Sequence, residues 1–259
     1  MTLLEGKKGL VVGVANERSY AWHIAKALTD HGAQCAYTHL PGDKTERRTR
    51  RATDAIGKDA WLRPMDASSD DEIQKTFDAY AADHDRMDFL VHSIAFADRE
   101  WLQPGKLIET PREAYRSAVD ISAYTLAAMT RAARPLLSKT GGSVMCMSYY
   151  GGEKVVPGYN VMGVAKAALE CAARYLAEEL RGEGVRVNVI SGGYLRTLAS
   201  SAVGGTDAMG DAAAERAPLR RGVEGDDVGG TAVYLASDLG KGVTGETIYV
   251  DCGINILGA

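Results

Sequence analysis

Short apolar runs alternate with amphipathic stretches along the whole chain, and this alternation constrains the fold more than any other feature. The first apolar run, residues 9–14, is rich in β-branched side chains and predicts a buried strand. In the next stretch, apolar residues recur at helical spacing from Ala21 to Leu28. The same pair of patterns then repeats to the end of the chain.

Strands are expected at residues 9–14, 34–38, 61–62, 89–93, 143–147, 185–190 and 247–250. Helices are expected at residues 20–31, 44–56, 70–82, 112–137, 159–180 and 226–236. Parallel neighbouring strands need crossover connections, so this order is typical of a parallel sheet covered on both faces. We therefore predict an α/β fold with a single Rossmann-like, doubly wound parallel sheet of about seven strands.

Composition favours one large domain spanning residues 1–259. Hydrophobic residues make up 46% of the chain and charged residues 25%, which allows a sizeable core. The net charge of −4 gives no general reason to expect a nucleic-acid partner. The four cysteines form no C-x-x-C pair, which argues against a zinc site or a disulfide framework. With no apolar stretch long enough to span a membrane, we expect a cytoplasmic protein without metal, nucleic-acid or membrane partners.

The turn after the first expected strand could hold a phosphate. It contains Gly13, with Ala15 and Ser19 at further positions where small residues are needed, although the full G-x-G-x-x-G pattern is absent. Such a turn lets the backbone approach a pyrophosphate, while the next helix points N–H groups at the anion. Taken alone, the turn does not distinguish a dinucleotide site from an ordinary strand–helix connection.

The adenosine end of such a site is less clearly marked. Dinucleotide sites normally place an acidic residue after the second strand, but residues 38–42 contain none. Arginines at 47–51 could favour a ribose phosphate, although a solvated helix face is the simpler explanation. Asp66 and Ala67, after the third strand, could reach the adenine.

Tyr159 and Lys166 are the best candidates for chemistry. Tyr159 begins the long helix expected at 159–180, and Lys166 lies two turns further along the same face. The ammonium could hold the ribose of a nicotinamide cofactor and lower the pKa of the phenol. The phenol could donate a hydrogen bond to an oxygen that becomes negative during a reduction. A half-buried tyrosine and a surface lysine without catalytic roles are the alternative.

A second tyrosine–lysine pair must be distinguished from this one. Tyr150 and Lys154 match the Tyr-x-x-x-Lys pair of ketone-reducing short-chain dehydrogenases, which requires a helix to bring the two side chains together. Gly151 and Gly152 lie between them and Pro157 follows, all poor residues for a helix. We therefore assign the chemistry to the later pair.

The residues around this pair extend the pattern along essentially the whole chain. Tyr149 lies ten residues before Tyr159, giving a tyrosine followed by a Tyr-x6-Lys pair. The other characteristic segments are residues 13–21, 92–97, 120–124, 148–151, 159–167, 184–188, 196–199 and 217–221. In this arrangement the chain resembles the bacterial enoyl-acyl-carrier-protein reductase family, a divergent branch of the short-chain dehydrogenases.

The resemblance implies a reaction in fatty-acid elongation: NADH delivers hydride to the β-carbon of a trans-2-enoyl thioester on an acyl-carrier protein. It implies three catalytic residues: Tyr159 stabilises the resulting enolate oxygen, Lys166 holds the nicotinamide ribose, and Tyr149 is the second active-site tyrosine. Ala97, Tyr149 and Tyr159 would contact the substrate.

The resemblance also implies a cofactor site, a lid and an assembly. The expected cofactor-binding residues are Gly13, Ser19, Tyr20, Leu40, Asp66, Ala67, Ser93, Ile94, Ala95, Lys166, Gly193, Leu195, Arg196, Thr197, Leu198 and Ala199. An apolar residue at Leu40 favours NADH, with NADPH as the alternative. A small substrate-binding lid is expected at about residues 195–217, where small residues are concentrated, and the assembly is expected to be a homotetramer.

Three departures from the family pattern keep other functions open. Ala95 and Tyr194 stand where the family has glycine and proline, and residues 200–215 contain no basic side chain that could meet an acidic carrier. They motivate one alternative, a specialised paralogue that reduces another conjugated enoyl substrate in a secondary pathway. Another is a non-catalytic dinucleotide-binding protein, which the retention of both tyrosines and Lys166 disfavours. A ketone or alcohol dehydrogenase stays possible on fold grounds alone.

Overall fold

The computed structural model describes residues 2–197 and 213–258 and contains one parallel sheet. Its strands are β1 (Lys8–Val12), β2 (Gln34–His39), β3 (Leu62–Pro64), β4 (Phe89–His92), β5 (Ser143–Ser148), β6 (Arg186–Gly192) and β7 (Thr247–Val250). Their order is β3-β2-β1-β4-β5-β6-β7, and every neighbouring pair is parallel. The predicted sheet is confirmed, and each predicted strand boundary lies within two residues of the observed one.

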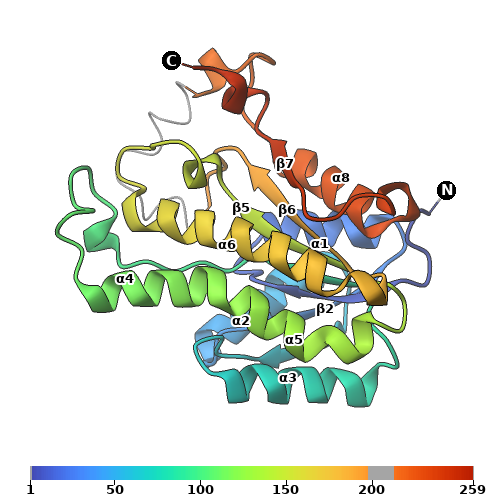
Figure 1. The fold of residues 1–259 in the computed structure, drawn as a ribbon. Coiled ribbons are helices and arrows are strands. Elements are labelled where there is room, and N and C mark those ends of the chain that lie inside the picture. The colour runs from blue at the N-terminus through green and yellow to red at the C-terminus, as the bar shows by residue number, and fades with distance from the viewer. Residues whose placement is uncertain (1, 198–212, 259) are drawn as a thin grey trace.

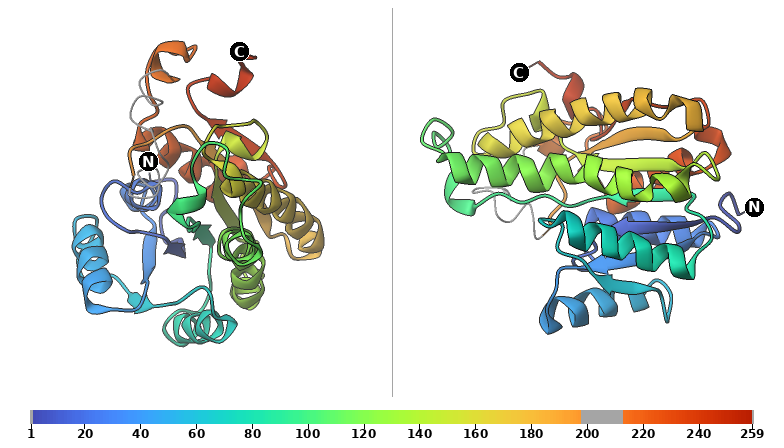
Figure 2. Two further views of the ribbon diagram at one scale, coloured as in Figure 1. Left: turned by 90° about the vertical axis from the view of Figure 1, so that its left-hand side faces the viewer. Right: turned by 60° about the horizontal axis from the view of Figure 1, so that its bottom comes forward.

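The helices are α1 (Tyr20–Asp30), α2 (Asp43–Asp54), α3 (Asp70–Asp83), α4 (Arg112–Val119), α5 (Thr125–Leu137), α6 (Asn160–Glu179) and α8 (Gly225–Ala236). Figures 1 and 2 show α3, α5 and α6 side by side on one face of the sheet, with α1, α2 and α8 on the other. The fold is therefore doubly wound, as predicted. None of the helices in the described ranges is long and apolar enough to cross a membrane.

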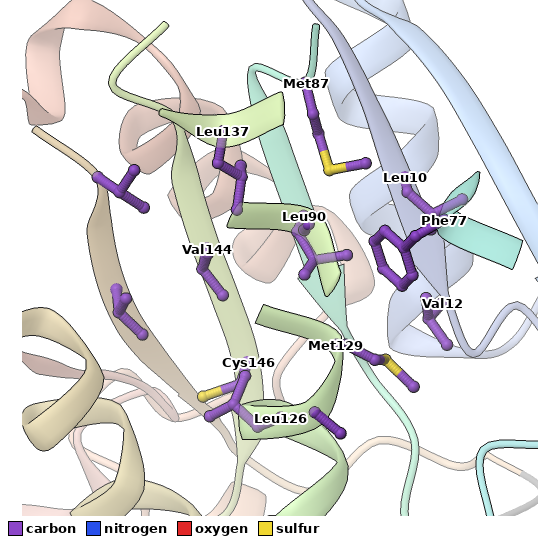
Figure 3. Packing of buried hydrophobic residues seen from close by; sticks show 14 of the residues in the cluster. Leu10, Val12, Phe77, Met87, Leu90, Leu126, Met129, Leu137, Val144 and Cys146 are labelled. Atoms are coloured by element: carbon purple, nitrogen blue, oxygen red, sulfur yellow. The ribbon is translucent and has the colours of Figure 1, made fainter. Parts of the chain in front are cut away.

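Each face of the sheet has its own hydrophobic core. On the α3–α5–α6 side, Phe77 packs beside Leu10 and Val12 of β1, as Figure 3 shows. On the other side, Ile24 and Leu28 of α1 belong to a second fully buried cluster that includes residues of α8. Because both faces of the central strands are buried, their sequences are continuous apolar runs rather than alternating ones.

The single helix expected at 112–137 is interrupted. A π-helical segment, η2 (Asp120–Tyr124), separates α4 from α5. Its wider turn leaves the apolar pattern nearly continuous, so periodicity alone does not reveal it. Such π segments occur often at functional sites, and this one lies beside the loop after β4.

Candidate active site

The carboxyl ends of β1 and β4 form the centre of the candidate site. The strand order reverses between these two neighbours, which is where ligands bind in open α/β sheets. Val12 pairs with His92, and the Ser93 N–H donates to the Val12 carbonyl at 3.0 Å. The loops after β4 and β5 and the beginning of α6 gather at this same edge, on the left in Figure 1.

Gly13 is required by the backbone at this point. Its φ is +111°, and a Cβ added there would lie 2.1 Å from the Ser93 carbonyl oxygen. Ser19 caps α1, where its hydroxyl accepts from the Trp22 N–H and donates to the Asn16 carbonyl at 2.8 Å. The first turn of α1 contains no acidic residue. The turn thus combines close backbone approach with an uncompensated helix N-terminus, and this fits a dinucleotide pyrophosphate.

Tyr20 connects this turn to the end of β6. Its hydroxyl donates to the Gly193 carbonyl at 2.6 Å, and its ring fills the space where a Gly192 Cβ would lie, 2.9 Å from the ring. Burial raises the pKa of the Tyr20 phenol well above its usual range, so it stays protonated. Because the Tyr20 hydroxyl bonds to the Gly193 carbonyl and its ring packs against Gly192, Tyr20 positions the end of β6.

The predicted adenosine contacts lie at the ends of β2 and β3. The Leu40 side chain follows β2 and is 59% exposed. Asp66 follows β3, and its carboxylate accepts from the Ser68 N–H at 2.9 Å and the Ser68 hydroxyl at 2.7 Å. Ala67 is half-buried beside it. These positions share the sheet edge with Gly13, as a dinucleotide extended along that edge requires.

Ser122 holds the segment after β4, which includes Ile94 and Ala95. The fully buried Ser122 hydroxyl accepts from the Phe96 N–H at 3.1 Å and donates to the Phe96 carbonyl at 3.3 Å. Ser122 belongs to the π segment, so the helical interruption positions the predicted cofactor loop. The sequence motif at 120–124 pointed to this region without suggesting a role.

The predicted catalytic side chains are close together in the structure. The Tyr149 and Tyr159 rings meet edge to face with centroids 5.1 Å apart. Tyr149 directly follows β5 and Tyr159 is the N-cap of α6. Lys166, only 6% exposed, donates from Nζ to the Met147 carbonyl at 2.7 Å. The two tyrosines are therefore in contact, and Lys166 is bonded to the end of β5 two residues before Tyr149.

Glycines allow the turn after β5 to pack against α6. A Cβ at Gly151 would lie 2.6 Å from the Tyr159 ring, and one at Gly163 would lie 2.7 Å from the Gly151 carbonyl oxygen. Tyr150 begins a single 3₁₀ turn ending at Gly152, and Lys154 is exposed. No helix brings that pair together, so the rejection of the Tyr150–Lys154 pair is confirmed.

The electrostatics differ from the sequence-based expectation in one respect. Burial raises the pKa of Tyr159 above its usual range, with a further rise from the negative charge of Glu170, so the prediction that Lys166 lowers it was wrong. Burial also lowers the pKa of Lys166 to about 8. Both shifts arise mainly from desolvation, because both groups lie away from water. A phenol with a raised pKa is a hydrogen-bond donor, not a phenolate.

The predicted substrate side of the site is apolar. Ala97 and Tyr159 pack against one hydrophobic cluster, formed by Leu102, Ala118, Val161, Met162 and Ala165. This surface could face an acyl chain while the Tyr159 hydroxyl remains at the sheet edge.

The cofactor segment predicted after β6 is described only in part. Gly193 is buried, and its N–H donates to the Val250 carbonyl at 2.9 Å. Leu195 and Thr197 are half-buried and Arg196 is exposed. Leu198 and Ala199 lie outside the described residues, as does most of the predicted lid.

Two buried polar residues at the site were missed by the sequence analysis as functional candidates. His92 ends β4, and its Nε2 lies 2.8 Å from the Thr125 hydroxyl. Burial, with a smaller effect from Lys166, lowers the pKa of His92 to about 3, so it stays neutral. Glu170 lies one helical turn after Lys166 and is 4% exposed. Its spacing from Lys166 was the available signal, because an acid four residues after a lysine shares its helix face.

Comparisons with known proteins agree with this architecture along the whole chain. The family described as Enoyl-(Acyl carrier protein) reductase matches residues 13–255. The enoyl-[acyl-carrier-protein] reductase [NADH] of Nostoc sp. strain PCC 7120 is 46% identical over 260 residues, covering 100% of both chains.

Two solved structures are similar in sequence and fold. The Bacillus cereus enoyl-acyl carrier protein reductase with NADP+ and indole naphthyridinone has a TM-score of 0.96 and 43% identity, with 100% of each chain covered. The Anaplasma phagocytophilum reductase in complex with NAD has a TM-score of 0.93 and 43% identity, covering 99% of this chain and 97% of that one. The chain therefore belongs to the enoyl-(acyl carrier protein) reductase family.

Proposed function

We propose that the chain reduces the trans-2 double bond of an enoyl thioester, carried by an acyl-carrier protein, with NADH as the hydride donor. The observation that carries this proposal is the grouping of Tyr149, Tyr159 and Lys166 at the carboxyl edge of the sheet, which they share with Gly13. A dinucleotide-binding protein without turnover would not need two tyrosines in contact beside an apolar surface.

The residues at the carboxyl edge of the sheet would have separate roles in the reaction. When bound, NADH supplies the hydride that adds to the β-carbon of the enoyl thioester. Negative charge then develops on the thioester oxygen, and the protonated Tyr159 phenol is the donor that stabilises it. The Lys166 ammonium would hold the ribose hydroxyls beside that phenol. Tyr149 closes the opposite side of Tyr159 and limits where the thioester can lie.

The dinucleotide preference is part of the same proposal. The cofactor would lie along Gly13, Ser19, Leu40, Asp66 and the segment after β4, with its adenosine at the exposed Leu40 side chain. The relatives are described with NADH, NAD or NADP+, so both cofactors must be compared. An apolar side chain at Leu40 offers no charge to a ribose phosphate, and we infer a preference for NADH.

The test is the consumption of NADH with crotonyl-acyl-carrier protein, beside crotonyl-coenzyme A and a simple ketone, repeated with NADPH. Rapid turnover of the carrier-bound enoyl and none of the ketone is the expected result. Turnover of the coenzyme A thioester alone would indicate a specialised paralogue, with Tyr194 as the first residue to change. That side chain lines a small cavity with Gly193 and Ala217.

We further propose that residues 1–259 act as one cytoplasmic reductase domain and assemble as a homotetramer. Light scattering during gel filtration tests the assembly, and a mass of one subunit would refute it. The lid at about 195–217 stays a prediction, because residues 198–212 lie outside the described part of the chain. Carrier docking would use exposed basic residues at the end of the lid and beyond it, such as Arg216 and Arg220.

A further inference from the structure

Glu170 is a buried acid that the proposed reaction does not use. It lies on α6, one turn after Lys166, and only 4% of its surface is exposed. Burying a carboxylate costs free energy unless its oxygens are hydrogen-bonded or its charge is compensated. The Ser148 hydroxyl donates to Glu170 Oε1, so one such bond is present.

The bond to Ser148 is one of two that attach α6 to the end of β5. Lys166 Nζ donates to the Met147 carbonyl, and the next residue along β5, Ser148, donates to Glu170. The residue after Ser148 is Tyr149. Two neighbouring bonds thus fix the strand end that carries Tyr149 relative to the helix that carries Tyr159 and Lys166.

The turn after β5 also depends on Glu170. A Cβ at Gly152 would lie 3.1 Å from Glu170 Oε1 and 3.1 Å from the Ala167 N–H nitrogen. The carboxylate therefore lies between the end of β5 and the turn Tyr150–Gly152, so its size limits the packing of the turn and its bond to Ser148 holds the strand end. An exposed acid at the same spacing from a lysine would form only a weak surface pair.

The charged groups around Glu170 come from two elements: Glu153 lies in the turn, while Lys166 and Arg174 lie on α6. Burial raises the pKa of the Glu170 carboxyl, and the hydrogen bond from Ser148 opposes that rise. Tyr159 and Lys166 each sense the negative charge of Glu170, as does Tyr249 of β7. Desolvation lowers the pKa of the Lys166 ammonium to about 8, and Cys146 and then Glu170 oppose that lowering. Removing the charge of Glu170 would leave desolvation opposed by Cys146 alone.

We propose that Glu170 is a positioning residue: its carboxylate, held by Ser148, places an acidic group one helical turn from Lys166 and fixes the end of β5 that carries Tyr149. The catalytic value of this arrangement rests on the proposed function. The protonation state of Lys166 is independent of the proposed function, because it can be measured in the protein without cofactor or substrate.

The decisive experiment is the titration of Lys166 by NMR in protein with ¹³C-labelled lysine, its signal identified by its loss in Lys166→Arg. Glu170→Gln removes the charge and keeps an acceptor oxygen for Ser148. We expect the Lys166 midpoint to fall by about one pH unit, as expected for a nearby charge in a partly desolvated site. Glu179→Gln, an exposed change on the same helix, is the control and should leave the midpoint unchanged. An unchanged midpoint in Glu170→Gln, or an equal shift in the control, overturns the proposal.

Two further variants separate charge from attachment. Ser148→Ala removes the hydrogen bond and keeps the carboxyl group, so kcat should fall about fivefold to tenfold while the Lys166 midpoint shifts less than in Glu170→Gln. Glu170→Asp keeps the charge in a shorter side chain and should restore most of the midpoint shift, even if Glu170→Gln folds poorly. Failure of Glu170→Asp to restore the midpoint would contradict the role of the charge.

The same measurements distinguish this proposal from the proposed function. If the parent protein leaves NADH unoxidised with every enoyl thioester, the enzymatic assignment fails. The Lys166 midpoint in Glu170→Gln is still measurable, and its shift or constancy decides the role of Glu170 independently.

Discussion

At the carboxyl end of β1 the chain omits a side chain so that two backbone segments pack closely, whereas at the carboxyl end of β5 it places aromatic and charged groups at the sheet edge. Gly13 has a positive φ and a Ser93 carbonyl where its Cβ would lie. Tyr149 and Tyr159 instead pack against each other, and Lys166 bonds to the strand end. In the proposed function the first region only binds, whereas the second also stabilises developing charge.

This difference also separates how substitutions should act. A change at the β1 turn alters backbone fit, so it should affect stability and cofactor affinity together. A change beyond β5 alters single functional groups, so it should separate the rate of reduction from affinity. Four substitutions, in order of decreasing expected effect, test this contrast.

The largest effect is expected for Tyr159→Phe. Removing the donor to the enolate oxygen should lower kcat by about 100- to 1,000-fold, the usual cost of losing one such donor. NADH affinity should change by less than about threefold, because the ring and its packing remain. Single-turnover kinetics and fluorescence titration measure the two quantities. Tyr175→Phe, at an exposed tyrosine on the same helix, is the matched control and should retain parental kcat.

Gly13→Ala should have the next largest effect. The added Cβ would lie 2.1 Å from a backbone carbonyl, and the positive φ disfavours any side chain. We expect the free energy of unfolding to fall by about 2–3 kcal/mol, with weaker NADH binding. Urea denaturation measures the first effect. Gly57→Ala, where a Cβ meets open space, is the control; equal destabilisation by both would remove the steric explanation.

These two regions were not equally predictable from sequence. Helical spacing predicted that Tyr159 and Lys166 lie along one face of the long helix, whereas Tyr149, which follows β5, was added by the family resemblance; their catalytic roles stay a prediction. The need for glycine at position 13 could not be read from the incomplete glycine motif, because it depends on the neighbouring strand β4. Burial of Tyr159 depends on the turn at Gly151 packing against its ring, and for that reason its pKa was predicted in the wrong direction.

The fold itself could be predicted almost completely, and its one error is informative. A strand buried on both faces has a continuous apolar run, and a helix buried on one face has apolar residues at helical spacing. These two patterns identify the strands and helices. The π segment at Asp120–Tyr124 keeps the apolar pattern of its helix, so it was included in a longer helix. Its role becomes visible only through the Ser122 bonds to Phe96, which join residues distant in sequence.

Lys166→Ala should affect cofactor binding more than the chemical step. Hydrogen bonds to charged groups contribute about 1.5–3 kcal/mol, so NADH affinity should fall about 10- to 100-fold. In the parent, affinity should also decline as the pH rises through about 8, where Lys166 loses its proton. The variant should lack this decline. Parental NADH affinity in Lys166→Ala, measured across about pH 6–9.5 so as to bracket that pKa, would count against its role at the ribose.

The smallest effect is expected at the adenosine end. Leu40 is 59% exposed at the end of β2, so an arginine there can be accommodated without disturbing the core. Leu40→Arg would offer a bidentate donor to a ribose phosphate, and at an exposed site we expect NADPH affinity to rise about threefold to tenfold. NADH affinity should change little, and Leu40→Gln controls for the loss of the apolar side chain.

Because charged contacts at this site are screened, the gain in NADPH affinity should shrink as the salt concentration increases. A gain that persists at about 0.5 M salt, where exposed charges are strongly screened, would mean that the introduced guanidinium acts through adenine stacking instead. The dinucleotide would then lie differently along β2 than proposed.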